Sequence, residues 1–174
     1  MGAVGNDAHP GTQAMPFATV SKALSVAAPG DFIYVDAGEY AEKVFFGKSI
    51  SLEGAGADLV KFVWPAIVEP RFVVDNIPYY SQFDSYNGGG TNPANIVNIS
   101  GITIDGENRV FNEKAFVHGI RFHNAGGTIE NCVFKNFQNP GISDPTFKTD
   151  RAVYFQADQN TPAQINFNNN TIAN

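Results

Sequence analysis

The feature that most constrains the fold is an eight-residue pattern that occurs three times. The blocks align without gaps at residues 99–106, 129–136 and 167–174. In this alignment Ile104, Phe134 and Ile172 occupy one position, and every block ends in Gly or Asn. One short strand and its corner cannot bury an apolar face alone, so repeats of this kind stack on one another. The pattern therefore predicts a chain wound into stacked coils.

The rest of the chain beyond residue 31 has the same character. Short runs of β-branched and aromatic residues alternate with clusters of Gly, Asn, Asp and Pro, which is typical of strands joined by tight corners. A second pair of blocks, residues 119–123 and 152–156, also aligns. Gly and Asn suit such corners because a tight turn often needs positive φ. These observations predict an all-β domain.

A single helical pattern precedes the strands. Apolar residues recur there at helical spacing: Phe17, Val20, Leu24 and Ala27. Pro16 suits a first helical turn, where its missing N–H is not needed, and the Pro-Gly pair at 29–30 ends the pattern. We expect a helix over about residues 16–28.

Size and charge restrict the classes of function. A chain of 174 residues is expected to form one domain, residues 1–174, with a core of its own. Its net charge of −6, without a Lys/Arg cluster, argues against nucleic acid and anionic membrane as partners. An acidic polysaccharide would need a local basic strip or bound calcium. Cys132 is the one cysteine, so no internal disulfide forms, and its apolar surroundings indicate a buried side chain.

The beginning of the chain resembles a known family. Residues 5–20, with continuations at 23–24, 29–31 and 38–40, are similar to the opening segment of bacterial secreted proteins of the pectin-lyase-like superfamily. The later run 127–134 resembles the same superfamily. This resemblance implies a right-handed, single-stranded parallel β-helix whose open end is capped by a short N-terminal α-helix. It also implies an extracellular or cell-surface location.

The resemblance does not assign an activity, because a fold hosts many functions. The superfamily includes polysaccharide lyases, pectin esterases, glycoside hydrolases, phage tailspikes and adhesins. No catalytic signature of one enzyme family is intact, so no catalytic residue is carried over. The sequence ends at Asn174 in the middle of a coil. We expect a fragment that lacks its C-terminal cap, or a partner chain that contacts that end.

A candidate site follows from strand alternation in the second pair of blocks. Four polar side chains are predicted to point outward: Arg121, His123, Tyr154 and Gln156. The alignment places Arg121 beside Tyr154 and His123 beside Gln156, and Lys61 is a candidate to continue the row. His118 and His123 are five residues apart, so a regular strand would put them on opposite faces.

The segment before the second of these strands adds charged residues to the candidate site. With Arg121 and His123, the candidate catalytic residues are Lys148 and Arg151, and Asp144 and Asp150 are candidate calcium ligands. Lyase chemistry requires a base that removes the proton next to a uronate carboxylate and a cation that neutralises this carboxylate. These candidate residues include both kinds of group. Tyr154 and Gln156 would bind the sugar. Alternatively, the row is polar only because an outward strand face must be.

Aromatic residues are concentrated in a long segment, about residues 64–94, which we predict to be an insertion. Tyr79, Tyr80 and Tyr86 are its best candidates to stack on sugar rings. The alternative is that these aromatics pack against the side of the coil.

Two functions remain open from the sequence. The first is a carbohydrate-binding or carbohydrate-processing domain that holds a glycan along one sheet, with calcium as a candidate cofactor. The second is a structural module of a surface protein, adhesin or tailspike without catalytic activity.

Overall fold

The structure is a computed structural model that describes residues 4–86, 95–111, 115–138, 150–157 and 163–173. Within these ranges the chain forms one short helix, α1 (Val20–Val26), followed by fifteen strands. The expectation of an all-β domain is confirmed. Among the described residues, no helix is long and apolar enough to cross a membrane.

The strands form three sheets. Sheet 1 has the order β1 (Phe32–Val35), β4 (Ile50–Gly54), β8 (Asn95–Ser100), β11 (Ala125–Glu130), β14 (Ile165–Asn168). Sheet 2 has the order β2 (Gly38–Ala41), β5 (Val60–Val63), β9 (Thr103–Asp105), β12 (Val133–Lys135), β15 (Thr171–Ala173). Sheet 3 has the order β3 (Val44–Phe46), β7 (Ile77–Tyr86), β10 (Phe116–His123), β13 (Asp150–Gln156), with β6 (Phe72–Val74) paired to β7.

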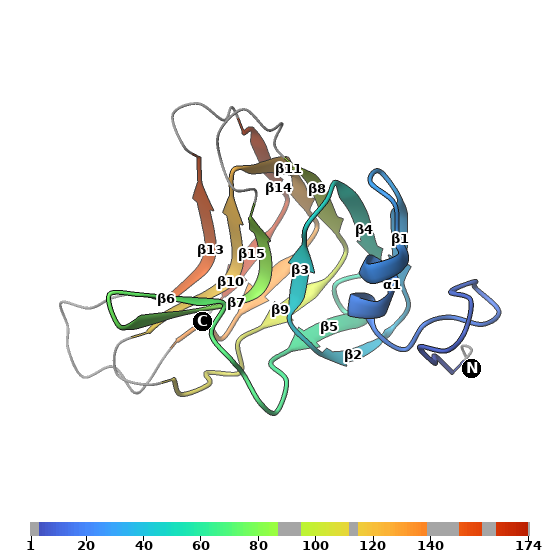
Figure 1. Ribbon diagram of the computed structural model, residues 1–174, viewed down its shortest axis with the longest axis horizontal. Coiled ribbons are helices and arrows are strands. Elements are labelled where there is room, and N and C mark those ends of the chain that lie inside the picture. The colour runs from blue at the N-terminus through green and yellow to red at the C-terminus, as the bar shows by residue number, and fades with distance from the viewer. Residues whose placement is uncertain (1–3, 87–94, 112–114, 139–149, 158–162, 174) are drawn as a thin grey trace.

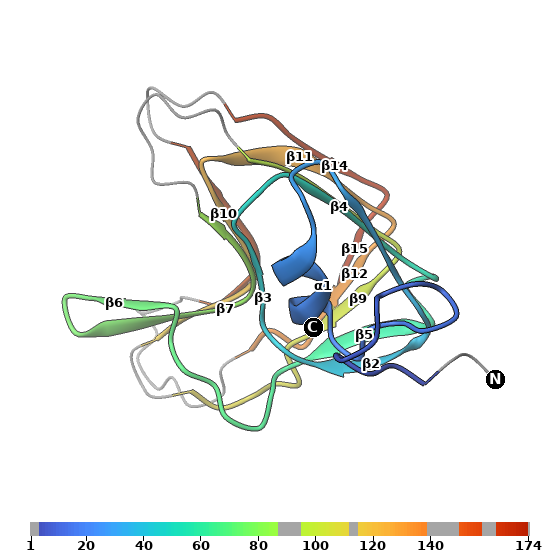
Figure 2. The same cartoon turned by 45° about the vertical axis from the view of Figure 1, so that its right-hand side comes forward.

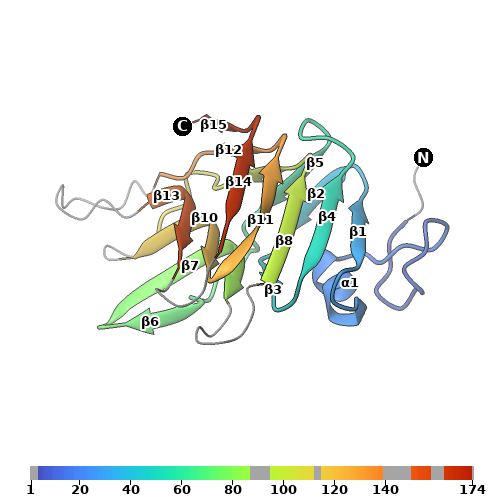
Figure 3. The same ribbon diagram turned by 90° about the horizontal axis from the view of Figure 1, so that it is seen from above.

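The chain passes through sheets 1, 2 and 3 in the same cyclic order on every circuit (Figure 1). Each strand of sheet 1 therefore lies beside the strand formed one circuit earlier, from β1 at one end to β14 at the other (Figure 3). Among the described strands, only β6 and β7 pair in antiparallel fashion. Viewed along the coil, the sheets surround the interior, and β6 and β7 project from its side (Figure 2).

The core consists of side chains that stack from circuit to circuit. In sheet 1, register partners form the buried stack Ile33, Leu52, Ile99 and Ile129. In sheet 2, Phe134 pairs with Ile104 on one side and with Ile172 on the other. The adjacency predicted from the eight-residue repeat is therefore confirmed at its central position.

Helix α1 is shorter than the predicted 16–28. Thr19 has extended backbone angles, and its side chain accepts a hydrogen bond from the Lys22 N–H, so Thr19 is the N-cap. The Glu42 carboxylate accepts hydrogen bonds from the N–H groups of Val20 and Ser21. Val20 and Leu24 are buried against the first circuit, which is how the helix covers this end of the core.

The corners between sheets 1 and 2 depend on Asn and Gly. Gly101, Asn131 and Asn169 all have positive φ at successive corners, as the repeat predicts. The Asn170 side chain accepts a hydrogen bond from the Cys132 N–H and donates one to the Ile129 carbonyl. Cys132 is buried, and burial raises the pKa of its thiol to about 11. These side chains join one circuit to the next where the backbone ladder is interrupted.

The predicted insertion over about 64–94 is wrong for residues 77–86. These residues form β7, which is a full member of sheet 3 between β3 and β10. The sequence suggested an insertion because this segment is rich in aromatic residues and matches neither set of repeat blocks. Residues 87–94 lie outside the described ranges.

Replacing Asn170 with Ala should destabilise the domain by about 1 kcal/mol, because the backbone groups of Cys132 and Ile129 would lose a partly buried hydrogen-bond partner. Asn166→Ala is the matched control, since Asn166 is an exposed residue of β14. Urea unfolding measures both variants. Equal free energies of unfolding for the two variants would contradict this role.

Candidate functional site

The predicted polar row lies on the outer side of sheet 3. Arg121 pairs with Tyr154 and His123 pairs with Gln156 in the β10–β13 ladder, as the sequence alignment predicts. On its other side, Arg121 pairs with Asp84 of β7, and Asp84 pairs with Phe45 of β3. The suggestion that Lys61 continues the row is wrong, because Lys61 belongs to β5 in sheet 2 and forms an ion pair with Glu39.

Arg121 does not project into solvent, contrary to the expectation of an outward row. It is only 5% exposed and its Nη1 lies 3.2 Å from Oδ2 of Asp84, which is 2% exposed. The Phe72 ring of β6 lies 4.6 Å from the guanidinium. The hairpin of β6 and β7 thus covers this part of the sheet, which alternation along one strand cannot reveal.

More cations surround the Asp84 carboxylate. Arg71 Nε lies 3.6 Å from Asp84 Oδ1, and the Arg71 guanidinium stacks 4.2 Å from the Phe45 ring. Lys43 donates a hydrogen bond to the Glu69 carbonyl. Burial and the charge of Arg71 lower the pKa of Lys43. One buried carboxylate is therefore accompanied by several positive groups.

His118 also lies on this side of sheet 3, so the prediction that His118 and His123 occupy opposite faces is wrong. Val117 and Ile120 are both core residues although they are three apart, so the alternation shifts between them. The His118 ring lies 5.1 Å from the Tyr154 ring. Burial, with smaller contributions from the charges of Arg121 and Arg151, lowers the pKa of His118 to about 3. His118 is thus neutral at pH 7.

Five residues of the site remain accessible: Tyr86, His123, Arg151, Tyr154 and Gln156. The Tyr154 hydroxyl donates a hydrogen bond of 3.0 Å to Oε1 of Gln156, and the Arg151 guanidinium lies 4.9 Å from the Tyr154 ring. His123 Nδ1 is 3.4 Å from Arg121 Nη2, and its ring meets Tyr86 edge-on at 5.1 Å. This set offers aromatic faces, hydrogen-bonding groups and one exposed cation.

Tyr79 and Tyr80 are not exposed aromatic platforms. Tyr79 is stacked between Phe72 and Phe116, at 4.6 and 4.5 Å between ring centroids. Tyr80 is 8% exposed and packs on Phe111 at 4.5 Å. Of the three tyrosines, Tyr86 alone is well exposed, at 44%.

The remaining candidates concern charge and metal. Asp144 and Lys148 lie outside the described residues. Asp150 is the first residue of β13 and pairs with Val117 in the ladder. Within the described ranges, no group of three or more His, Cys, Asp and Glu residues is placed to hold a metal ion.

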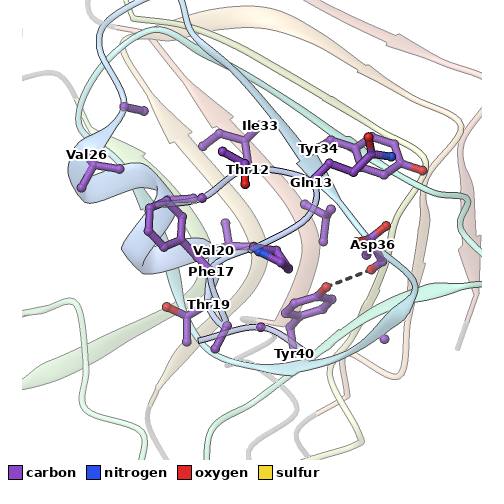
Figure 4. Close-up of a pocket in the computed structure, with 18 of the residues that line it drawn as sticks. Thr12, Gln13, Phe17, Thr19, Val20, Val26, Ile33, Tyr34, Asp36 and Tyr40 are labelled. Atoms are coloured by element: carbon purple, nitrogen blue, oxygen red, sulfur yellow. Dashed lines mark hydrogen bonds between the residues drawn. The ribbon is translucent and has the colours of Figure 1, made fainter. Parts of the chain in front are cut away.

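A separate hollow of about 930 Å³ lies at the N-terminal end of the coil. Its walls come from the segment before α1, from α1 itself and from residues 31–40 (Figure 4). Tyr34 and Tyr40 line it, and the Tyr40 hydroxyl donates a hydrogen bond to the Asp36 carbonyl. Sequence reasoning missed this hollow because no motif marks it and its walls meet only in the fold.

One family model matches the chain. Residues 3–47 match the family described as protein of unknown function (DUF1565). The match spans α1, β1, β2 and β3, and includes the residues that line the N-terminal hollow. No curated protein and no solved structure matches the chain.

The variant Arg121→Ala should destabilise the domain by roughly 3 kcal/mol, because it leaves Asp84 buried without its closest cation. Lys61→Ala, which breaks an exposed pair, should change stability by less than about 1 kcal/mol. The double variant Arg121→Met with Asp84→Leu should recover most of the loss. Thermal and urea unfolding give the values, and a loss no larger than that of Lys61→Ala would contradict the buried pair.

The free energy of unfolding should also fall as the pH is lowered below about 6.5. The unfolded chain protonates His118 near its ordinary pKa of 6.5, whereas the folded chain does so near 3, so protons favour unfolding between these values. This difference in pKa lowers the free energy of unfolding by at most about 1.4 kcal/mol per pH unit, and by at most roughly 2 kcal/mol between pH 6.5 and 5. This part of the slope should disappear in His118→Gln and persist in His9→Gln. Identical slopes in both variants would contradict the assignment.

Proposed function

We propose that the three sheets form a right-handed, single-stranded parallel β-helix of the pectin-lyase-like kind, with α1 as its N-terminal cap. The cyclic strand order, the parallel ladders and the position of α1 over the first circuit support this proposal. The match of residues 3–47 to a family model is compatible with it.

We propose further that the outer face of sheet 3 binds an acidic polysaccharide. The observation that carries this proposal is a group of three accessible cations beside one sheet in a chain of net charge −6: Lys43, Arg71 and Arg151. Such a strip supplies the local basic character that an acidic polymer requires of an acidic protein. Arg151 would pair with a uronate carboxylate, while Tyr86 and Tyr154 would stack on sugar rings.

Binding without cleavage fits the described residues better than lyase chemistry. Arg121 is held by Asp84 beneath the hairpin, so it is not free to neutralise a substrate carboxylate. His118 is neutral but has almost no exposed surface. His123 and Arg151 offer an accessible imidazole and an accessible guanidinium on this face. We propose an extracellular or cell-surface glycan-binding module on this basis.

The alternative is a stalk or adhesin module in which the same face is only a solvated sheet surface. Affinity electrophoresis in gels containing polygalacturonate or neutral dextran distinguishes the two. Retardation is expected in the polygalacturonate gel and not in the dextran gel. Arg151→Ala should lower the affinity for polygalacturonate about tenfold, which corresponds to the loss of one charge-assisted contact.

Lys61→Ala is the matched control, because it removes one positive charge from sheet 2 and should leave retardation unchanged. Equal weakening by both variants would show that retardation depends on the net charge and not on the position of Arg151. No retardation in either gel would favour the structural module. New reducing or unsaturated chain ends in the polymer would instead establish an enzyme.

A further inference from the structure

The N-terminal hollow is bordered by two strands that, within the described part of the chain, pair on one side only. β1 is the first strand of sheet 1 and pairs with β4, and β2 is the first strand of sheet 2 and pairs with β5. An edge strand presents backbone N–H and C=O groups that can pair with another strand. Here these edges face the hollow, since residues 32–35 and 38–40 line it.

The direction of the free groups follows from the ladder. The carbonyls of Asp31 and Val35 accept hydrogen bonds from Ser51 and Ala55, at 3.0 and 2.9 Å. Backbone groups alternate between the two edges of a strand, so those of Phe32 and Tyr34 point away from β4 and toward the hollow. Among the described residues, no backbone hydrogen bond joins the segment before α1 to this edge.

The two sides of the hollow differ in chemistry. The side formed by α1 is apolar and carries small side chains, including Val20, Ala23 and Ala27. On the outer side, Phe32 and Tyr34 are 58% and 56% exposed. The lining residues include the carboxylates of Asp31, Asp36 and Glu39 and no Lys or Arg. Asp31 accepts a hydrogen bond from Ala28 and Glu39 pairs with Lys61. Among the described residues, Asp36 is then the lining carboxylate without such a partner, and we take it as the one that meets a basic ligand group.

We propose that this hollow binds an extended peptide, which adds a strand to the free edge of β1. The peptide would alternate small apolar residues, packed against Ala23 and Ala27, with basic residues beside Tyr34 and Asp36. Side chains of a strand alternate between faces with a period of two, so one such peptide satisfies both sides at once. Backbone pairing supplies affinity and the alternating side chains supply specificity. A sugar would use the aromatic faces but would leave the backbone edge unpaired.

The test uses a fluorescein-labelled peptide of seven residues that alternates valine with arginine, measured by fluorescence anisotropy on the full chain. Saturable binding is expected. Two further peptides keep every side chain but carry N-methyl groups on all valines or on all arginines. Because the N–H groups of the two sets point to opposite edges of a strand, one set should weaken binding at least about tenfold and the other should not.

The protein variant Asp36→Asn should weaken binding several-fold, as expected for the loss of one charge-assisted contact. Glu53→Gln is the matched control, because Glu53 is an exposed carboxylate of β4 that does not line the hollow. Equal effects of the two N-methylated peptides, or equal effects of the two protein variants, would overturn the proposal. So would the absence of saturable binding. Binding of cellohexaose that is lost in Tyr34→Ala, without peptide binding, would assign the hollow to a neutral sugar and overturn it as well.

Discussion

The register between successive circuits is the constraint on which the rest of this structure depends. A parallel strand keeps its apolar residues toward the core only if it pairs residue for residue with the previous circuit, and a slip by one would expose them. Ile33, Leu52, Ile99 and Ile129 hold that register in sheet 1. Asn side chains at the corners then fix where each circuit bends. Because the register is fixed, the outer side chains of neighbouring circuits also stand in rows.

The rows on sheet 3 give the molecule its most distinctive surface. Register brings Asp84, Arg121 and Tyr154 side by side, and the hairpin of β6 and β7 covers the first two. Burial turns the Asp84–Arg121 pair into a structural element, since neither charge could remain there without the other. Tyr154 at the accessible end of this row, and Arg151 beside its ring, remain in contact with solvent. The Asp84–Arg121 pair is electrically neutral as a whole, so the accessible groups beside it, Arg151, Tyr154 and Gln156, carry the proposed glycan recognition.

The repeat in the sequence was sufficient for the parallel coils, the corner residues and the pairing of Arg121 with Tyr154. The repeat did not predict the position of side chains where the chain departs from the repeated pattern. Alternation placed Arg121 outward but could not indicate that Phe72 lies over it, because that contact joins segments outside the pattern. The shift between Val117 and Ile120 moved His118 to the same side as His123. β7 was mistaken for part of an insertion because its residues match neither set of repeat blocks, and Tyr79 and Tyr80 were therefore expected in solvent.

An NMR titration of the backbone amides with hexagalacturonate, in the absence of calcium, would test directly whether sheet 3 binds a glycan. Saturable shifts are expected only at the accessible residues near the ends of β7, β10 and β13, around Tyr86, His123 and Tyr154. The amides of sheet 1, including Ser51 and Asn98, should not shift. Shifts centred on sheet 1, or none at saturating oligosaccharide, would contradict a glycan-binding face on sheet 3.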